Sequence, residues 1–74
     1  MAYKDNDSCL QKAESDEPVF TLRSQDRLGS ILVDLWADLA KEHGCPEEKV
    51  KEAHECASKM RAWQLITGRA KWPD

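Results

Sequence analysis

The polar side chains best suited to directed chemistry lie together in one short segment. They are Arg23, Gln25 and Asp26. A guanidinium group can hold a phosphate or a carboxylate through two parallel hydrogen bonds, and amide and carboxylate groups can recognise hydrogen-bonding edges. In an extended chain, Phe20 and Leu22 lie on one side, so a small apolar face would fix the position of the polar groups. The pattern predicts a recognition site; the alternative is structural, with Asp26 capping a turn and Arg23 pairing with an acid.

A second set of residues, near the C-terminus, combines cations with an indole. Its members are Arg61, Arg69, Lys71 and Trp72. Cations attract phosphate groups, and an indole can stack on a nucleotide base. Trp63 falls on the apolar side of a predicted helix, so we expect it in the core instead. We interpret both polar sets as candidate ligand-binding or partner-binding residues, which in an oligomer could line one pocket between subunits.

The sequence offers little for metal binding or catalysis. His54 and Cys56 form one of two His-x-Cys pairs, but side chains two residues apart on a helix differ in direction by about 200°, so they cannot hold the same ion. Asp34 and Asp38, one helical turn apart, are typical of a solvated face. No serine or cysteine sits in a nucleophile motif, and there is no glycine-rich phosphate loop. We therefore expect no metal site, no cofactor and no enzymatic activity.

These side chains must be positioned by a small helical scaffold. Apolar residues repeat with helical spacing over residues 30–43 and over residues 46–67, and Gly44 and Gly68 are suited to end the two helices. A connection of about two residues makes the helices antiparallel neighbours. The predicted fold class is therefore all-α: an antiparallel two-helix hairpin with a short N-terminal extended segment, over residues 18–67.

Polar segments flank this hairpin. Residues 1–17 contain five acids and few apolar groups, so we predict a flexible acidic arm. Residues 68–74 form a short basic tail around Trp72. The net charge of −3 argues against general binding to polyanions such as nucleic acid.

Length, cysteine count and hydropathy indicate the cellular setting. The 74 residues form one domain, whose small core leaves the free energy of unfolding near zero without further support. Three cysteines cannot all pair, and the sequence shows no apolar signal segment, so we expect reduced thiols in a cytosol. No apolar run reaches the roughly 18 residues that span a membrane. The missing support is expected from oligomerisation.

The apolar stripe of the first helix is wider than the second helix can cover. Ala53 and Ala57 permit close approach but offer little apolar area, so part of the stripe is left for another chain. A short extended segment likewise cannot persist unpaired in water, so it should lie on the helices or pair with its copy in a second subunit. We predict at least a homodimer. Its predicted interface consists of Phe20, Leu22, Leu32, Leu35, Trp36 and Leu39.

An ordered pattern of residues runs through the hairpin. It consists of Pro18 to Asp26, Leu28, Trp36-Ala37, Gly44, Lys49-Val50 and Met60 to Trp63. In this pattern the chain resembles a group of short uncharacterised proteins encoded by tailed phages and prophages. The resemblance implies a helical hairpin in a phage or bacterial cytosol; it implies no activity and no catalytic residues. Where those proteins carry Ala-Pro before the first helix, this chain has Gly29-Ser30.

Small size, the lack of catalytic motifs and the resemblance together favour a protein that acts by binding. Our leading hypothesis is a phage-type accessory protein that inhibits a host process, such as a defence system, by capturing a host protein or a phosphorylated nucleotide signal. One alternative is a nucleic-acid-binding regulator that uses the basic tail. The other is a structural or assembly component that needs only the apolar stripe.

Overall fold

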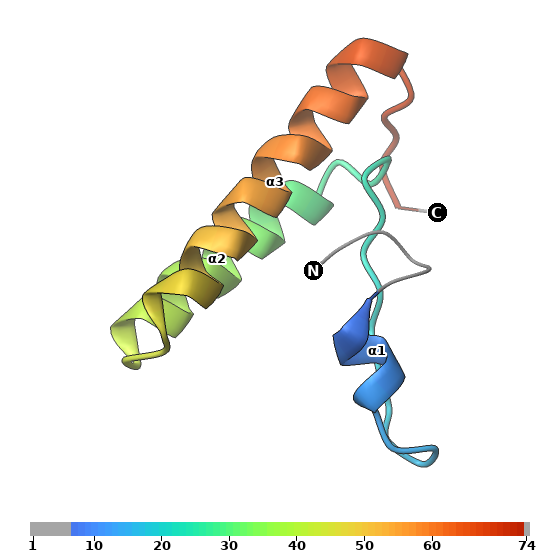
Figure 1. Ribbon diagram of the computed structural model, residues 1–74. Coiled ribbons are helices and arrows are strands. Elements are labelled where there is room, and N and C mark those ends of the chain that lie inside the picture. Colours follow the sequence, from blue (N-terminus) through green and yellow to red (C-terminus); the bar gives the residue numbers. More distant parts are fainter. Residues whose placement is uncertain (1–6, 74) are drawn as a thin grey trace.

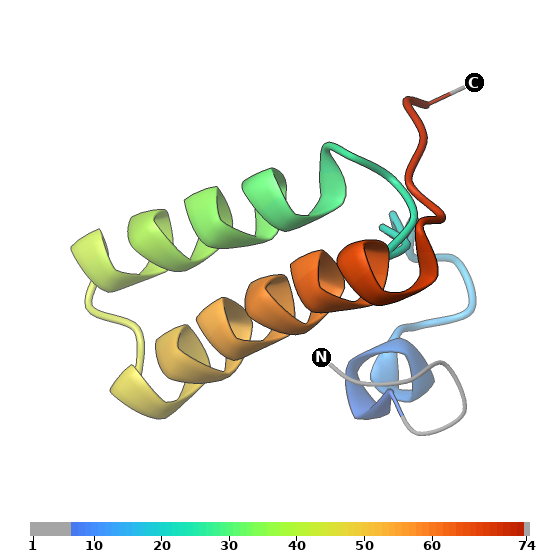
Figure 2. The ribbon, with the colours of Figure 1, turned by 90° about the horizontal axis from the view of Figure 1, so that it is seen from above.

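Two of the helices in the described chain form the body of the molecule. The computed structural model describes residues 7–73. Its helices are α1 (Ser8–Lys12), α2 (Gly29–Glu42) and α3 (Glu47–Thr67). α2 and α3 pack side by side in opposite directions and are joined by a short turn (Figures 1 and 2). The predicted all-α hairpin is confirmed, and residues 7–73 contain no strand.

The helix ends follow from local sequence signals. Glu47 and Glu48 occupy the first turn of α3, where the partial positive charge of the helix N-terminus favours acids. Gly68 ends α3 in the left-handed conformation, with a φ of 66°, and its N–H donates to the carbonyl of Gln64. The observed ends of α2 and α3 lie within one residue of the predicted ones.

Small side chains form the contact between α2 and α3. Ala37, Ala53 and Ala57 are completely buried, and Val50 and Met60 extend this core along α3. Because methyl groups occupy little space, the two backbones can approach each other closely. No large side chain among the described residues is fully buried, so the core of a single chain is thin.

The large apolar side chains of α2 point away from α3. Ile31 is 60% exposed, and Leu35 and Trp36 are about half exposed. The wide stripe predicted for this helix therefore divides: its small residues face α3, and its large residues stay on the surface. We call this surface the outer face of α2; it consists of Leu28, Ile31, Leu32, Leu35, Trp36 and Leu39. In the described part of the chain, no helix has both the length and the apolar character required to cross a membrane.

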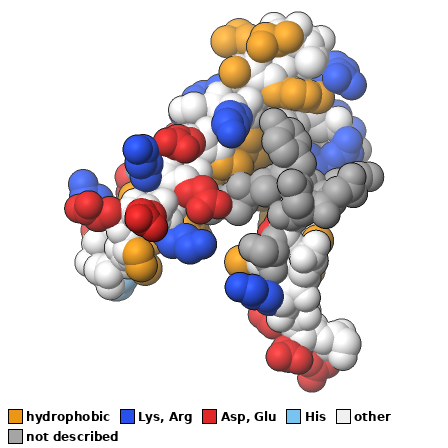
Figure 3. Space-filling model, in the orientation of Figure 1, with side chains coloured by type: hydrophobic (Ala, Val, Ile, Leu, Met, Phe, Trp, Pro, Cys, Tyr) orange, Lys and Arg blue, Asp and Glu red, His pale blue; other side chains and the backbone are white. Residues whose placement is uncertain are grey.

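A separate apolar surface lies at the C-terminal end of α3. Hydrophobic side chains gather there, whereas acids and bases are mixed along the rest of the visible face of the hairpin (Figure 3). Leu65 and Ile66 are the large side chains at this end, and both are more than four-fifths exposed.

The segment before the hairpin is largely irregular. α1 is a single short helix, in which the side chain of Asp7 accepts hydrogen bonds from the N–H groups of Cys9 and Leu10. Residues 1–6 of the predicted arm and the last tail residue lie outside the described residues. The segment predicted to be extended forms no strand in the structure: Phe20 is 86% exposed, and Leu22 is half-buried.

Candidate functional site

The basic tail meets the segment from Arg23 to Asp26, which we call the Arg23 segment, at one end of the hairpin. The N–H of Lys71 donates to the carbonyl of Gln25 (2.8 Å), and the N–H of Arg27 donates to the carbonyl of Lys71 (2.9 Å). These bonds form an isolated parallel bridge between Asp26 and Lys71. The chain that precedes α2 and the chain that follows α3 therefore lie side by side (Figure 2).

α3 holds this junction in place through one side chain. The Gln64 amide donates from Nε2 to the carbonyl of Ser24 (2.6 Å) and to the carbonyl of Asp26 (3.2 Å). Gly29 allows the close approach, because a Cβ at this position would lie 2.9 Å from Cε of Met60 and 3.0 Å from the carbonyl oxygen of Arg23. The Arg23 segment is thus packed against the end of the hairpin.

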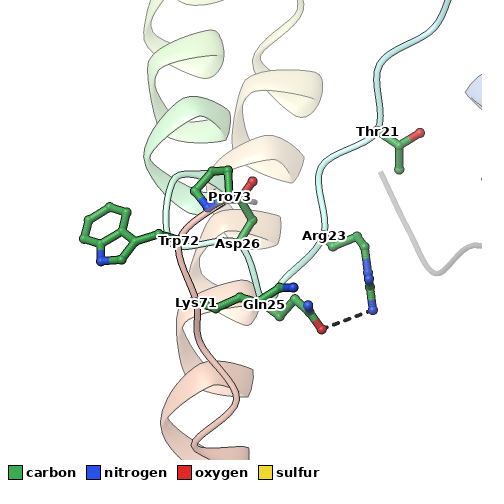
Figure 4. Close-up of a pocket in the computed structure, with 7 residues that line it drawn as sticks. All are labelled: Thr21, Arg23, Gln25, Asp26, Lys71, Trp72 and Pro73. Carbon is green, nitrogen blue, oxygen red and sulfur yellow. Dashed lines mark hydrogen bonds between the residues drawn. The ribbon is translucent and has the colours of Figure 1, made fainter.

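An open pocket of about 180 Å³ lies at the junction (Figure 4). It is lined by Thr21, Arg23, Gln25, Asp26, Lys71, Trp72 and Pro73. Five of the seven predicted ligand-binding residues are therefore brought together, from two segments that are far apart in the sequence. Thr21 and Pro73 were not among the predicted site residues.

Arg23 is the cation best placed for an anion. Its Nη2 donates to Oε1 of Gln25 (3.1 Å), and both side chains lie at the pocket (Figure 4). Among the described residues, no carboxylate forms an ion pair with Arg23. The structural alternative, in which Arg23 pairs with an acid, thus has no partner in residues 7–73. The Gln25 bond orients the guanidinium and leaves most of its five donors for a ligand.

Asp26 has the structural role that the sequence offered as an alternative. Its Oδ1 accepts a hydrogen bond from the N–H of Leu28 (2.8 Å), and its carbonyl accepts one from the N–H of Gly29 (3.0 Å). Because these bonds hold the turn that leads into α2, Asp26 shapes the pocket through the backbone.

Trp72 presents an indole that is 63% exposed at the edge of the pocket. The Cζ atom of Arg27 lies 5.7 Å from the centre of its ring system, within the range of a cation–π contact. Sequence analysis missed Arg27, although a cation directly after Asp26 was a signal. Its pairing with Trp72 depends on the tail returning to the start of α2, which no local pattern encodes.

Arg61 and Arg69 do not line the pocket. Arg69 stacks on Trp63, with its Cζ 4.5 Å from the ring centre, and Arg61 donates to Asp34 across the hairpin (2.7 Å). Arg69 thereby helps to hold the tail against α3, and Arg61 links α2 to α3. Trp63, predicted to belong to the core, is half-buried.

Four charged or titratable side chains link α2 to α3. This interhelical cluster consists of Asp34, Asp38, His54 and Arg61. Nδ1 of His54 lies 2.8 Å from Asp34, and Nε2 lies 3.3 Å from Asp38. Hydrogen bonds from His54 and from Arg61 hold the pKa of the Asp34 carboxyl below its usual value. The two aspartates thus bind the partner helix, whereas their spacing had suggested a solvated face.

No metal-binding group of three histidine, cysteine or acidic side chains occurs within residues 7–73. The chain was also compared with known proteins. It matches no protein-family model, no curated protein and no solved structure. The geometry of the pocket is therefore the basis for a functional assignment.

Proposed function

We propose that this chain is a non-enzymatic binding protein that captures a small phosphorylated nucleotide at the pocket between the Arg23 segment and the tail. One observation carries the proposal: a guanidinium, an ammonium, an amide and an indole line the same open pocket. Phosphate requires cations, and a base requires a flat apolar surface with nearby hydrogen-bonding groups.

Five of the seven lining residues have a role in this proposal. Arg23 binds phosphate oxygens through paired hydrogen bonds, and Lys71 adds a second positive charge. Trp72 stacks on the base, because about two-thirds of its surface is exposed. Gln25 holds Arg23 and can also meet polar groups of the ligand. Asp26 keeps the turn in place.

The lining residues support capture without turnover. Neither cysteine nor histidine lines the pocket, and Thr21 is its single hydroxyl-bearing side chain. An activated nucleophile needs a base within hydrogen-bonding reach and a third group that orients the base. Together with the resemblance to small phage proteins, this supports a role in which the protein sequesters a host nucleotide signal and so inhibits a host process.

Thermal shift measurements with nucleotides and with inorganic phosphate test the proposal. A nucleotide at about 100 times its dissociation constant should add about 2.7 kcal/mol to the free energy of unfolding, which for a domain of this size raises Tm by roughly 10 °C or more. Arg23→Ala and Trp72→Ala should abolish the shift. Lys51→Ala removes an exposed cation near the start of α3, outside the pocket, and should leave the shift unchanged.

The results separate the proposed ligand from its alternatives. If no nucleotide raises Tm, or if Arg23→Ala responds as the unmodified protein does, nucleotide capture is wrong. Binding to single-stranded nucleic acid that weakens steeply with salt would favour a regulator instead. A protein captured through the Arg23 segment, with no response to nucleotides, would favour a protein target.

A further inference from the structure

We infer that the outer face of α2 is covered by the same face of a second copy of this chain, with the two α2 helices antiparallel and centred on Leu35. The face carries six large apolar side chains, each 38 to 60% exposed in one chain. Their spacing, at positions 28, 31, 32, 35, 36 and 39, places them on one side of a helix. α3 covers the opposite side, through Ala37 and Ala40.

The surface area of the single chain exceeds that of a compact monomer of the same mass. A folded monomer of 8.4 kDa exposes about 4,600 Å². This chain exposes 6241 Å², about a third more. A stable dimer of standard size covers about 800 Å² on each partner, which is less than this excess; the outer face of α2 shares the excess with the exposed segment before the hairpin.

Charge complementarity sets the direction of the pair. A cation stands at the N-terminal end of the outer face, where Arg27 precedes Leu28 and lies over Trp72. At the other end, Glu42 continues the same side of the helix one turn beyond Leu39. An antiparallel pair places Arg27 of one copy near Glu42 of the second copy. A parallel pair would place like charges together at both ends, which is unfavourable.

The same arrangement brings the second copy to the edge of the pocket. The outer face begins two residues after Asp26, which lines the pocket, so the α2–α3 turn of the second copy would lie beside Arg27. The pocket of one chain, about 180 Å³, is smaller than the roughly 300 to 1,000 Å³ of most ligand sites. This part of the inference rests on the proposed function: the second copy would supply the missing wall.

Disulfide cross-linking distinguishes the two directions without any ligand. The background variant replaces the native thiols (Cys9→Ser, Cys45→Ser, Cys56→Ala). In an antiparallel pair, Leu35→Cys lies opposite its own copy and should form a disulfide dimer under mild oxidation. Ile31→Cys should not, because the two copies of residue 31 are about 12 Å apart along the helix axis. Ile31→Cys mixed with Leu39→Cys should form the mixed dimer.

Light scattering on the unmodified protein should give at least twice the chain mass of 8.4 kDa. Leu35→Glu should weaken the dimer by at least roughly 30-fold, as expected for the loss of an interface hot spot. Because Leu35 is half-exposed and does not belong to the core between α2 and α3, helix content by circular dichroism should match that of the unmodified protein at concentrations where the variant is still dimeric. Leu65→Glu, on the separate apolar surface, is the matched control and should leave the dimer intact.

Several results would overturn the inference. A monomer at all concentrations would leave the face for a different protein. Self-cross-linking of Ile31→Cys would show a parallel pair. An intact dimer in Leu35→Glu, with loss of the dimer in Leu65→Glu, would move the interface to the end of α3. Since none of these measurements involves a nucleotide, a failure here is distinct from a failure of nucleotide capture.

Discussion

The interhelical cluster makes a prediction whose size and pH dependence can both be worked out. Asp34→Asn replaces the carboxylate that meets His54 through one oxygen and Arg61 through the other. An amide has one accepting oxygen, so its NH₂ group must face one of these donors. The side chain of Asp34 is 32% exposed, and those of its partners are 42 and 47% exposed. Partly exposed pairs contribute up to about 1 kcal/mol each, so we expect a total loss of about 1 kcal/mol.

The sign of the pH effect follows from the lowered pKa. Because the pKa of Asp34 is lower in the folded state than the unperturbed 3.8, the carboxylate stabilises the fold above that value. This contribution falls as the pH drops below 3.8 and through the folded pKa, and it is absent when the carboxyl is protonated in both states. The difference between the unmodified protein and Asp34→Asn should therefore be fully present above pH 3.8 and shrink as the pH falls through the lower, folded-state pKa.

Urea unfolding, followed by circular dichroism at one protein concentration, measures this difference. With a slope of about 1 kcal/mol/M, Asp34→Asn should lower the midpoint by about 1 M near neutral pH. Asp38→Asn is the control: Asp38 is 66% exposed and meets His54 at 3.3 Å, so its loss should cost under about 0.5 kcal/mol. Equal midpoints near neutral pH, or a difference that persists in acid, would refute the assigned role of Asp34.

Three further substitutions test the positioning of the site and the packing of the hairpin. Gln64→Ala should lower the free energy of unfolding by about 1 to 2 kcal/mol and weaken nucleotide binding, because it removes the donor shared by two carbonyls of the Arg23 segment. Urea unfolding measures the first effect, and calorimetric titration measures the second. Ala53→Leu should destabilise the hairpin by about 1 to 3 kcal/mol in thermal unfolding, because no space is left at a fully buried contact. Gly68→Ala should lower Tm, with a loss of about 1 kcal/mol in the free energy of unfolding, because a Cβ is unfavourable at a φ of 66°. An unchanged Tm in Ala53→Leu would contradict the tight helix packing, and an unchanged Tm in Gly68→Ala would contradict the role of Gly68 in ending α3.

The helices could be predicted from the sequence because their signals are local. Periodic apolar residues, acids in the first turn of α3 and glycine after its end each act within a few residues, and the observed ends agree within one residue. Local signals do not show which side of a broad stripe faces the partner helix. In α2 the side with Ala37 and Ala40 does so, because small residues allow the close approach that Leu35 and Trp36 would prevent.

The candidate site divides in the same way between sequence and tertiary structure. The chemical types of Arg23, Gln25, Lys71 and Trp72 identified them individually, because guanidinium, amide, ammonium and indole groups keep their properties in any fold. Only the tertiary structure decided that they line one pocket, since their meeting depends on two backbone hydrogen bonds between the tail and the start of α2. It also separated Arg61 from the pocket, because Asp34, on the neighbouring helix, provides a closer partner for its charge.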